Sequence, residues 1–496
     1  MPTRREVLGQ TIAASLALGL SGGRAAAQDR YDQAALLQFY PLGDITLLHY
    51  SDLHGMMHPH FMRPAAVRYG PDRVPNLVGE ALRIRYGIGG RTPMDAAMTA
   101  EGFDALGDVY GPMGGLAHMA AVLRAVRAAR PGALVLDGGG TDSALAGEVL
   151  APDAATFGAR GAVPSEGIAL NVEGQPAEAT FDRGGTQVAV IGLADPHRPG
   201  AGVSLDRVQR AVADRRAAGA AVVVLLSRMG FEADRALASG IEGVDVILSG
   251  HSGYALPEPE VIGGTRIVAS GAQGRFISRV DIAVEKGRMS ELRHRLIPVF
   301  SALIRPDASA AQRLPAAETA QVGVAAAMLH HRDTFSGTWE ALIGEAMLAE
   351  TGAQVALVPP LRVAETVLPG QPILSRQLAG VAEGRHLAAH RLTGVAIALL
   401  LEAAAEAAFA QDPFARQETR MMRAAGLTYT IAPDADEGAR ISGLSLVTDG
   451  TPLEPDTDVA VALLQDGGGT PLSEALHRIV ARRGQVAVTP AAVTVR

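Results

Sequence analysis

The chain has 496 residues, 48% of them hydrophobic and 19% charged, which is enough to form two or three globular domains. Its net charge is −8 and it has no basic run interleaved with aromatic residues, which argues against a nucleic-acid partner. It contains no cysteine, and this excludes disulfides, thiolate metal sites and cysteine catalysis.

The N-terminus has the pattern of an export signal. Arg4 and Arg5 precede an apolar run at 11–20, and the small residues at 25–27 suit a cleavage site. Paired arginines are typical of the twin-arginine route, which exports folded proteins. The run is too short for a permanent anchor, and no other segment is a transmembrane candidate. We therefore assign 1–27 to a twin-arginine signal peptide and expect a periplasmic protein without a membrane anchor. An amphipathic first helix is the alternative.

The first buried strand is predicted by the apolar run at 45–50, which ends shortly before Asp52 and His54. In an extended segment, side chains two residues apart point the same way, so these two would converge beyond the strand end. A carboxylate beside an imidazole is a plausible half-site for a divalent metal. Asp-x-His is a common pattern, however, and by itself is weak evidence for metal binding.

Strands then alternate with helices as far as about residue 300. We expect helices at 114–129 and 205–217, and strands at 133–136, 187–192, 220–226 and 244–248. Glycine-rich loops follow several of these strands. The alternation predicts an α/β sheet with a ligand crevice at the carboxyl ends of its strands.

The composition changes beyond residue 299. The Ala-rich segment 310–330 predicts a long helix, and further helices are expected at 338–352 and 395–409. We therefore predict a first domain at 40–300, a linker helix within 301–335, and a second α/β domain at 336–490.

A series of sequence blocks resembles the 5′-nucleotidase superfamily of dinuclear metallohydrolases, and within it the SoxB family, the periplasmic thiosulfohydrolases of sulfur oxidation. In chain order the blocks are LLHYSDLHG, FMRP, NLVGEAL, GGLAH, LVLDGG, GIEGVDVILSGHS, ASG, LIPVFS, TVLPGQ and RLTG. The resemblance implies a four-layer αββα sandwich of the metallophosphatase type, followed by a smaller 5′-nucleotidase-type α/β domain after a linker helix. It also implies two manganese ions, which lower the pKa of a bridging water and clamp the oxyanion.

The metal ligands implied by the resemblance are only partly present. Asp52 and His54 stand at the first ligand pair, and His251 stands at the first His of a Gly-His-Thr-His block. Gly140 replaces the bridging Asp, and Arg228 replaces a His. In the family, His251 belongs with the opposite metal from the first pair, so the three remnants need not converge on one ion.

Two further departures concern the later His pair and the catalytic acid. Gly253 stands in the second position of the His pair, and Tyr254 stands where an Asp often follows. The block of Gly-Asn-His-Glu type, with a ligand and the catalytic acid, is missing, because the chain between Ser143 and Asn171 is too short for it.

Three nearby residues could substitute for the missing metal ligands. Asp142 lies two residues beyond the lost bridge, and His58 and His60 follow the Asp-x-His pair. Asp142 is a candidate ligand if its loop shifts, and the alternative is that all three are solvated loop residues. Arg228 puts a permanent cation where a neutral imidazole would donate a lone pair. It either binds an anion such as sulfate or phosphate, or it pairs with a carboxylate such as Asp52.

The favoured hypothesis is a SoxB-like periplasmic protein of thiosulfate oxidation that is catalytically impaired or inactive. Its manganese would be weakly bound, single or absent, and a sulfur-carrier protein is its expected partner. The first alternative is an active thiosulfohydrolase with a rearranged or single metal site. The second is an exported 5′-nucleotidase-type phosphoesterase, which would require an aromatic clamp in the second domain. Phe409, Phe414 and Tyr429 are the candidates for that clamp, although we expect each in the core.

Overall fold

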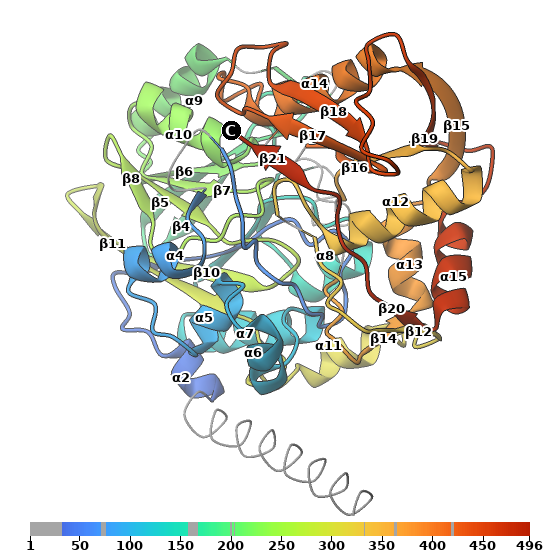
Figure 1. Cartoon of the computed structure of the whole chain (residues 1–496). Coiled ribbons are helices and arrows are strands. Elements are labelled where there is room, and N and C mark those ends of the chain that lie inside the picture. Colours follow the sequence, from blue (N-terminus) through green and yellow to red (C-terminus); the bar gives the residue numbers. More distant parts are fainter. Residues whose placement is uncertain are drawn as a thin grey trace, which may run out of the picture. The chain divides into compact units, whose positions relative to one another are not determined.

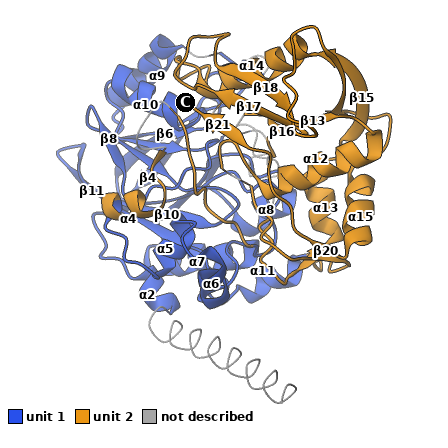
Figure 2. Ribbon diagram, viewed as in Figure 1, with its two compact units in different colours: residues 1–60, 86–314 blue, residues 61–85, 315–496 orange. Residues whose placement is uncertain are grey.

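The computed structural model describes residues 32–70, 76–156, 167–198, 201–202, 204–331, 333–361, 365–417 and 421–496. The expected signal peptide at 1–27 lies outside these residues. The chain divides into two compact units (Figures 1 and 2). Unit 1 comprises Met1–His60 and Tyr86–Leu314, and unit 2 comprises Phe61–Arg85 and Pro315–Arg496. Within the described residues, no helix has both the length and the apolar character that crossing a membrane requires.

Unit 1 contains two β-sheets. The first has the order β11 (Arg288–Pro298), β10 (Phe276–Glu285), β1 (Ile45–Tyr50), β2 (Leu134–Asp137) and β3 (Ala154–Ala155). The second has the order β4 (Glu178–Arg183), β5 (Thr186–Leu193), β6 (Val222–Ser227), β7 (Val246–Ser249), β9 (Thr265–Ala269) and β8 (Glu260–Ile262). Alternate apolar residues of both sheets, such as Leu47, Leu136, Val190 and Val224, form one buried cluster. The sheets therefore pack face to face.

Helices flank this pair of sheets. On α7 (Leu116–Ala129), Leu116, Met119, Leu123 and Val126 are buried at helical spacing, so one face of the helix packs inward. The other helices among the described residues of unit 1 are α2 (Gln33–Leu37), α5 (Pro93–Met98), α6 (Phe103–Tyr110), α8 (Ala144–Leu150), α9 (Leu205–Ala217), α10 (Phe231–Gly240) and α11 (Ala308–Arg313). Of these, α9 contacts β5 and β6, and α10 contacts β7, β8 and β9. The expected αββα sandwich is confirmed.

Strand direction places several loops at one edge of each sheet. β1 and β2 run parallel in the first sheet, and β5, β6, β7 and β9 run parallel in the second. In the second sheet, Leu193, Ser227 and Ser249 lie in register at the carboxyl ends of β5, β6 and β7. The loops that follow these three strands therefore emerge together.

Unit 2 is a second α/β unit with three small sheets. Their orders are β14 (Pro372–Leu374), β12 (Gln321–Ala325), β20 (Gln485–Val486); β15 (His386–Thr393), β19 (Asp458–Gln465), β13 (Val355–Val358), β16 (Arg423–Ala425); and β18 (Ile441–Leu446), β17 (Leu427–Ile431), β21 (Val493–Val495). The helices are α4 (Gly79–Tyr86, its last residue in unit 1), α12 (Thr338–Thr351), α13 (Ser375–Ala382), α14 (Gly394–Phe409) and α15 (Leu472–Arg483). One core surrounds Trp339, and another includes Leu401, Phe409 and Tyr429.

The helix expected over 310–330 is much shorter in the structure. α11 ends at Arg313, and the segment from Gln321 continues as strand β12, which pairs with β14 and β20. Pro315 follows the C-cap residue Leu314, and a proline disfavours the helical conformation of the residue before it. Alanine content alone therefore overestimated the helix.

Candidate functional site

The candidate site lies at the carboxyl ends of β1, β2, β5, β6 and β7 in unit 1. Backbone hydrogen bonds connect the loops that follow the strands. The amides of Asp52 and His54 donate to the carbonyls of Gly139 and Gly140, each at 2.7 Å. The amide of Gly250 donates to the carbonyl of Ser227 at 2.8 Å. The chain thus fixes the positions from which the predicted site residues project.

Asp52 is the most enclosed of these residues, with 1% of its surface exposed. Its Oδ1 accepts a hydrogen bond from Nη1 of Arg228 at 2.9 Å, and its Oδ2 accepts one from the amide of His251 at 2.6 Å. Burial alone would raise the pKa of Asp52, but Arg228, His54 and His251 together hold that pKa below its usual range. Of the two alternatives for Arg228, the structure has the pairing with Asp52.

Two glycines leave room for the guanidinium of Arg228. A Cβ atom on Gly140 would lie 2.5 Å from Nη1 of Arg228 and 2.7 Å from Oδ1 of Asp52. A Cβ atom on Gly139 would lie 3.0 Å from Cδ of Arg228. Both glycines also have positive φ, 89° at Gly139 and 69° at Gly140. The guanidinium therefore occupies the space into which a side chain at position 140 would project.

The two remnant histidines face carboxylates of their own. Nδ1 of His54 lies 3.7 Å from Oδ2 of Asp142, and Nε2 of His251 lies 3.4 Å from Oδ2 of Asp195. These four side chains are between 17% and 34% exposed. Asp195 was not singled out from the sequence. Its position just after β5 is the signal that could have identified it.

The prediction that Asp52 and His54 share a direction through extended spacing is wrong. Both have left-handed backbone conformations, with φ of 53° and 50°, and neither lies in a strand. The side chain of Asp52 turns to Arg228, whereas that of His54 turns to Asp142. The loop turns sharply here, so alternation no longer sets the side-chain directions.

Left-handed backbone is concentrated around the site. Among the described residues, nine other than glycine have positive φ, and five of them belong to these loops: Asp52, His54, Asp142, His251 and Gln273. Each such residue costs about 1–2 kcal/mol, so the surrounding contacts must hold these conformations in place. Gln273, for example, donates its amide to the carbonyl of Asp52 at 2.8 Å. Strain of this kind tends to collect at functional sites.

His58 and His60 do not both remain in solvent. His60 is 3% exposed, its backbone pairs with Met113, and its ring contacts the carbonyl of His58. The expectation of three solvated loop residues is therefore wrong for His60. His58 is partly exposed, and Asp142 keeps about a third of its side-chain surface exposed.

Two buried titratable groups below the loops were not predicted. Burial lowers the pKa of His49 to about 3, and it raises the pKa of Asp137 to about 6. Nδ1 of His49 lies 2.6 Å from Oγ of Ser270, which donates to Oγ of Ser278 at 2.8 Å. His49 is hidden in an otherwise apolar run, where the sequence gives no hint of this row of polar groups.

The donor set does not fit a dinuclear metal centre. Within the described part of the chain, no group of three or more His, Asp or Glu side chains is placed to hold a metal ion. Gly140 has no carboxylate to bridge two cations, and a guanidinium already lies against Asp52. We therefore derive no reaction step through a metal.

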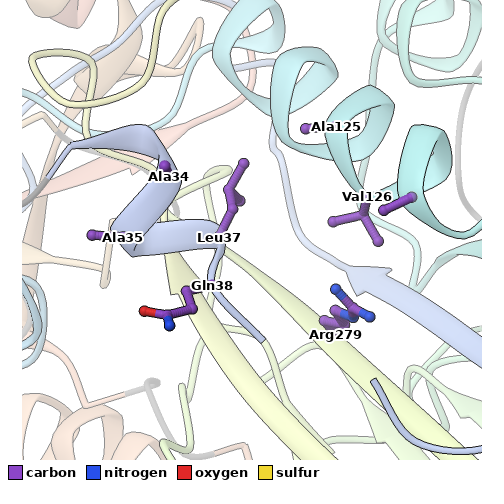
Figure 3. A pocket seen from close by; sticks show the side chains of 8 residues that line it. Ala34, Ala35, Leu37, Gln38, Ala125, Val126 and Arg279 are labelled. Carbon is purple, nitrogen blue, oxygen red and sulfur yellow. The ribbon is translucent and has the colours of Figure 1, made fainter. Parts of the chain in front are cut away.

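A separate cavity of about 590 Å³ lies between α2 and α7 (Figure 3). Its walls include Leu37 and Val126, and Arg279 lies beneath them. The guanidinium of Arg279 stacks on the ring of Phe39 and pairs with Asp281. None of the predicted site residues lines this cavity.

Comparisons with known proteins agree with this architecture. The family model for the 5′-nucleotidase C-terminal domain matches residues 316–468. The structure of a sulfate thiohydrolase SoxB from Thermus thermophilus, in complex with glycerol, is 30% identical with a TM-score of 0.85. That match covers 92% of this chain and 98% of the other.

More distant matches concern the fold or only part of the chain. A 5′-nucleotidase precursor from Thermus thermophilus shares the fold at 18% identity and a TM-score of 0.70, over 91% of this chain and 99% of its own. An uncharacterized metallophosphoesterase of Bacillus subtilis (strain 168) is 26% identical over 115 residues, or 22% of this chain. The chain spans between 17% and 25% of the length of the curated relatives it matches.

Proposed function

The chain belongs to the 5′-nucleotidase superfamily as a SoxB-like member, and on this premise we propose that it is an exported SoxB-like protein of thiosulfate oxidation whose dinuclear hydrolytic chemistry is impaired or lost. The observation that carries this proposal is the ion pair of Arg228 with Asp52, formed over Gly140. A permanent cation there takes the place of the positive charge that the family's metals would bring.

Electrostatics supports the loss of metal binding. A divalent ion on Asp52 would face the guanidinium of Arg228, which does not deprotonate in proteins. At a separation of ~4 Å and an effective dielectric constant of ~20, the repulsion would be about 8 kcal/mol. The missing carboxylate at Gly140 removes the compensating negative charge. We therefore expect manganese to bind weakly, singly or not at all.

A binding role is consistent with the extent of the likeness to the Thermus SoxB, which spans nearly the whole of both chains. In our proposal the protein keeps the surface of a SoxB-like fold and acts as an accessory component for a sulfur-carrier protein in the periplasm. An active enzyme with one metal is the alternative, and it would draw its ligands from the His54–Asp142 or His251–Asp195 pairs.

A nucleotidase has less support. Phe409 and Tyr429, two of the three candidates for an aromatic clamp, are 3% and 2% exposed and belong to a core of unit 2. Side chains in that position cannot stack on a base without opening the core. Phe414 is partly exposed and is the remaining candidate.

The metal content of the mature protein tests the proposal. The protein would be incubated with Mn²⁺, desalted and measured by elemental mass spectrometry, with the Thermus SoxB treated identically as the positive control. We expect no more than one equivalent per chain, and little or no hydrolysis of a carrier-bound thiosulfonate. Two equivalents per chain would refute the proposal, and one equivalent with turnover would establish the single-metal alternative.

A further inference from the structure

We propose that Arg228 and Gly140 form a compensating pair, in which the guanidinium serves as the structural counter-ion of the site loops in place of a divalent metal. The inference rests on the proposed function, because Asp52 is left to Arg228 only where no dinuclear centre forms. In this proposal Arg228 is a positioning residue that holds the site loops together. Loss of the reaction alone would not require such a role.

The contacts of Asp52 and Arg228 connect the loops that follow several strands. Asp52 follows β1, Arg228 follows β6, and His251 follows β7. The two oxygens of Asp52 accept from Arg228 and from the amide of His251, and the amide of Arg228 donates to the carbonyl of Leu193 at the end of β5. A metal ion joins loops in the same way, by collecting ligands from different strand ends.

Asp52 and Arg228 are charged groups held away from solvent. The side chains of Asp52 and Arg228 are 1% and 12% exposed, so neither charge is well solvated. The guanidinium also acts electrostatically on Asp137, which is fully buried at the end of β2. Removing Arg228 would leave both carboxyl groups without this cation. A buried charge that loses its partner is among the costliest defects in a folded protein.

Gly140 leaves the space that the guanidinium of Arg228 occupies. The Cβ of any residue larger than glycine at position 140 would approach Nη1 of Arg228 to 2.5 Å, well inside van der Waals contact. An arginine at 228 and an aspartate at 140 therefore exclude each other in this arrangement. Restoring a metal-binding arrangement would require both positions to change, and changing one alone would produce a defect.

Stability measurements on the full mature protein test the counter-ion role. We expect Arg228→Gln to lower the Tm by roughly 6–15 °C, because Asp52 becomes a buried charge without its cation. The double variant Asp52→Asn/Arg228→Gln has no such charge and should recover more than half of the loss. The wild type, Asp52→Asn, Arg228→Gln and the double variant together form a double-mutant cycle.

A manganese titration tests the exchange of guanidinium for metal. The Tm of the Gly140→Asp/Arg228→His variant should rise when Mn²⁺ is added, whereas the Tm of the wild-type protein should not. Arg216→His is the matched control, because Arg216 forms another enclosed pair in unit 1, with Asp245, away from these loops. It should lower the Tm without making it depend on Mn²⁺.

The outcomes separate the two proposals. If Arg228→Gln is as stable as the wild type, or if it fails to fold and the double variant is no better, the counter-ion role is refuted while the proposed function stands. If the wild-type protein holds two manganese ions, the proposed function fails irrespective of these Tm values. If the Gly140→Asp/Arg228→His variant shows no response to Mn²⁺, the exchange of guanidinium for metal is refuted.

Discussion

Replacing Gly140 by alanine should be far more damaging than the addition of one methyl group suggests. Position 140 has φ of 69°, so a side chain there costs about 1–2 kcal/mol in backbone strain. The new Cβ would lie 2.5 Å from Nη1 of Arg228 and 3.0 Å from Cα of Asp52. The backbone atom cannot yield cheaply, so the guanidinium must move and break its pair with Asp52. Breaking a buried pair costs ~3–5 kcal/mol, and the total is about 4–7 kcal/mol.

Gly287 provides the control for the backbone contribution. It lies between β10 and β11 in the same unit, has φ of 72°, and has no atom within 4 Å of the position of an added Cβ. In denaturant titrations followed by circular dichroism, Gly287→Ala should therefore lose only about 1–2 kcal/mol. Combining Gly140→Ala with Arg228→Ala should cost less than the sum of the two changes, because the clash disappears. Equal losses for Gly140→Ala and Gly287→Ala would refute the steric argument.

Three further predictions concern pH, the second unit and metal removal. Since the folded state holds the pKa of His49 near 3, the unfolded chain takes up its proton first, and the free energy of unfolding should fall by about 4–5 kcal/mol between pH 6.5 and 3 from this group alone. His49→Asn should flatten that dependence in acid-titrated denaturation curves, whereas His390→Asn at an exposed position should not. Trp339, the single tryptophan, donates Nε1–H to the carbonyl of Glu365, so Trp339→Phe should destabilise unit 2 by ~2–4 kcal/mol, measurable by limited proteolysis of that unit. Incubation of the wild-type protein with EDTA should leave its Tm unchanged in differential scanning calorimetry, and a clear fall would contradict a metal-independent fold.

The sequence predicted secondary structure best where the apolar residues of a single strand or helix recur at regular spacing and are buried. The strand expected at 45–50 and the helix expected at 205–217 have the predicted bounds, because a short buried apolar run and a capped amphipathic helix are local properties. The helix prediction for 310–330 failed because it used only the local composition, whereas the strand that forms there depends on distant partner strands. β12 forms by pairing with β14 and β20, which lie about 50 and 160 residues further along the chain.

The candidate site was predictable in part. Parallel pairing brings the positions after β6 and β7 to neighbouring loops, which the alternation of strands and helices already implied. β1 belongs to the other sheet, so the approach of Asp52 to these loops did not follow from that alternation. The pairing of Arg228 with Asp52 followed from charge as one of two alternatives. The pairing of His251 with Asp195 could not be predicted, because Asp195 comes close to His251 through the register of the sheet and not through sequence spacing. The predicted side-chain direction of Asp52 was wrong because its left-handed backbone does not follow the alternation of side chains along a strand.

If the proposed function holds, the strained loops explain how this architecture persists without the ligands of a metal centre. Each left-handed residue costs about 1–2 kcal/mol, and a backbone hydrogen bond returns about 1 kcal/mol net. Asp52 takes part in two such bonds, donating to Gly139 and accepting from Gln273, and His54 donates to Gly140. These bonds hold the backbone whether or not a cation is present, so only the charge of Asp52 still requires a partner. Arg228 supplies that partner from within the chain. A member of this superfamily could therefore lose its metals one ligand at a time, provided that a cation of its own replaced them at Asp52.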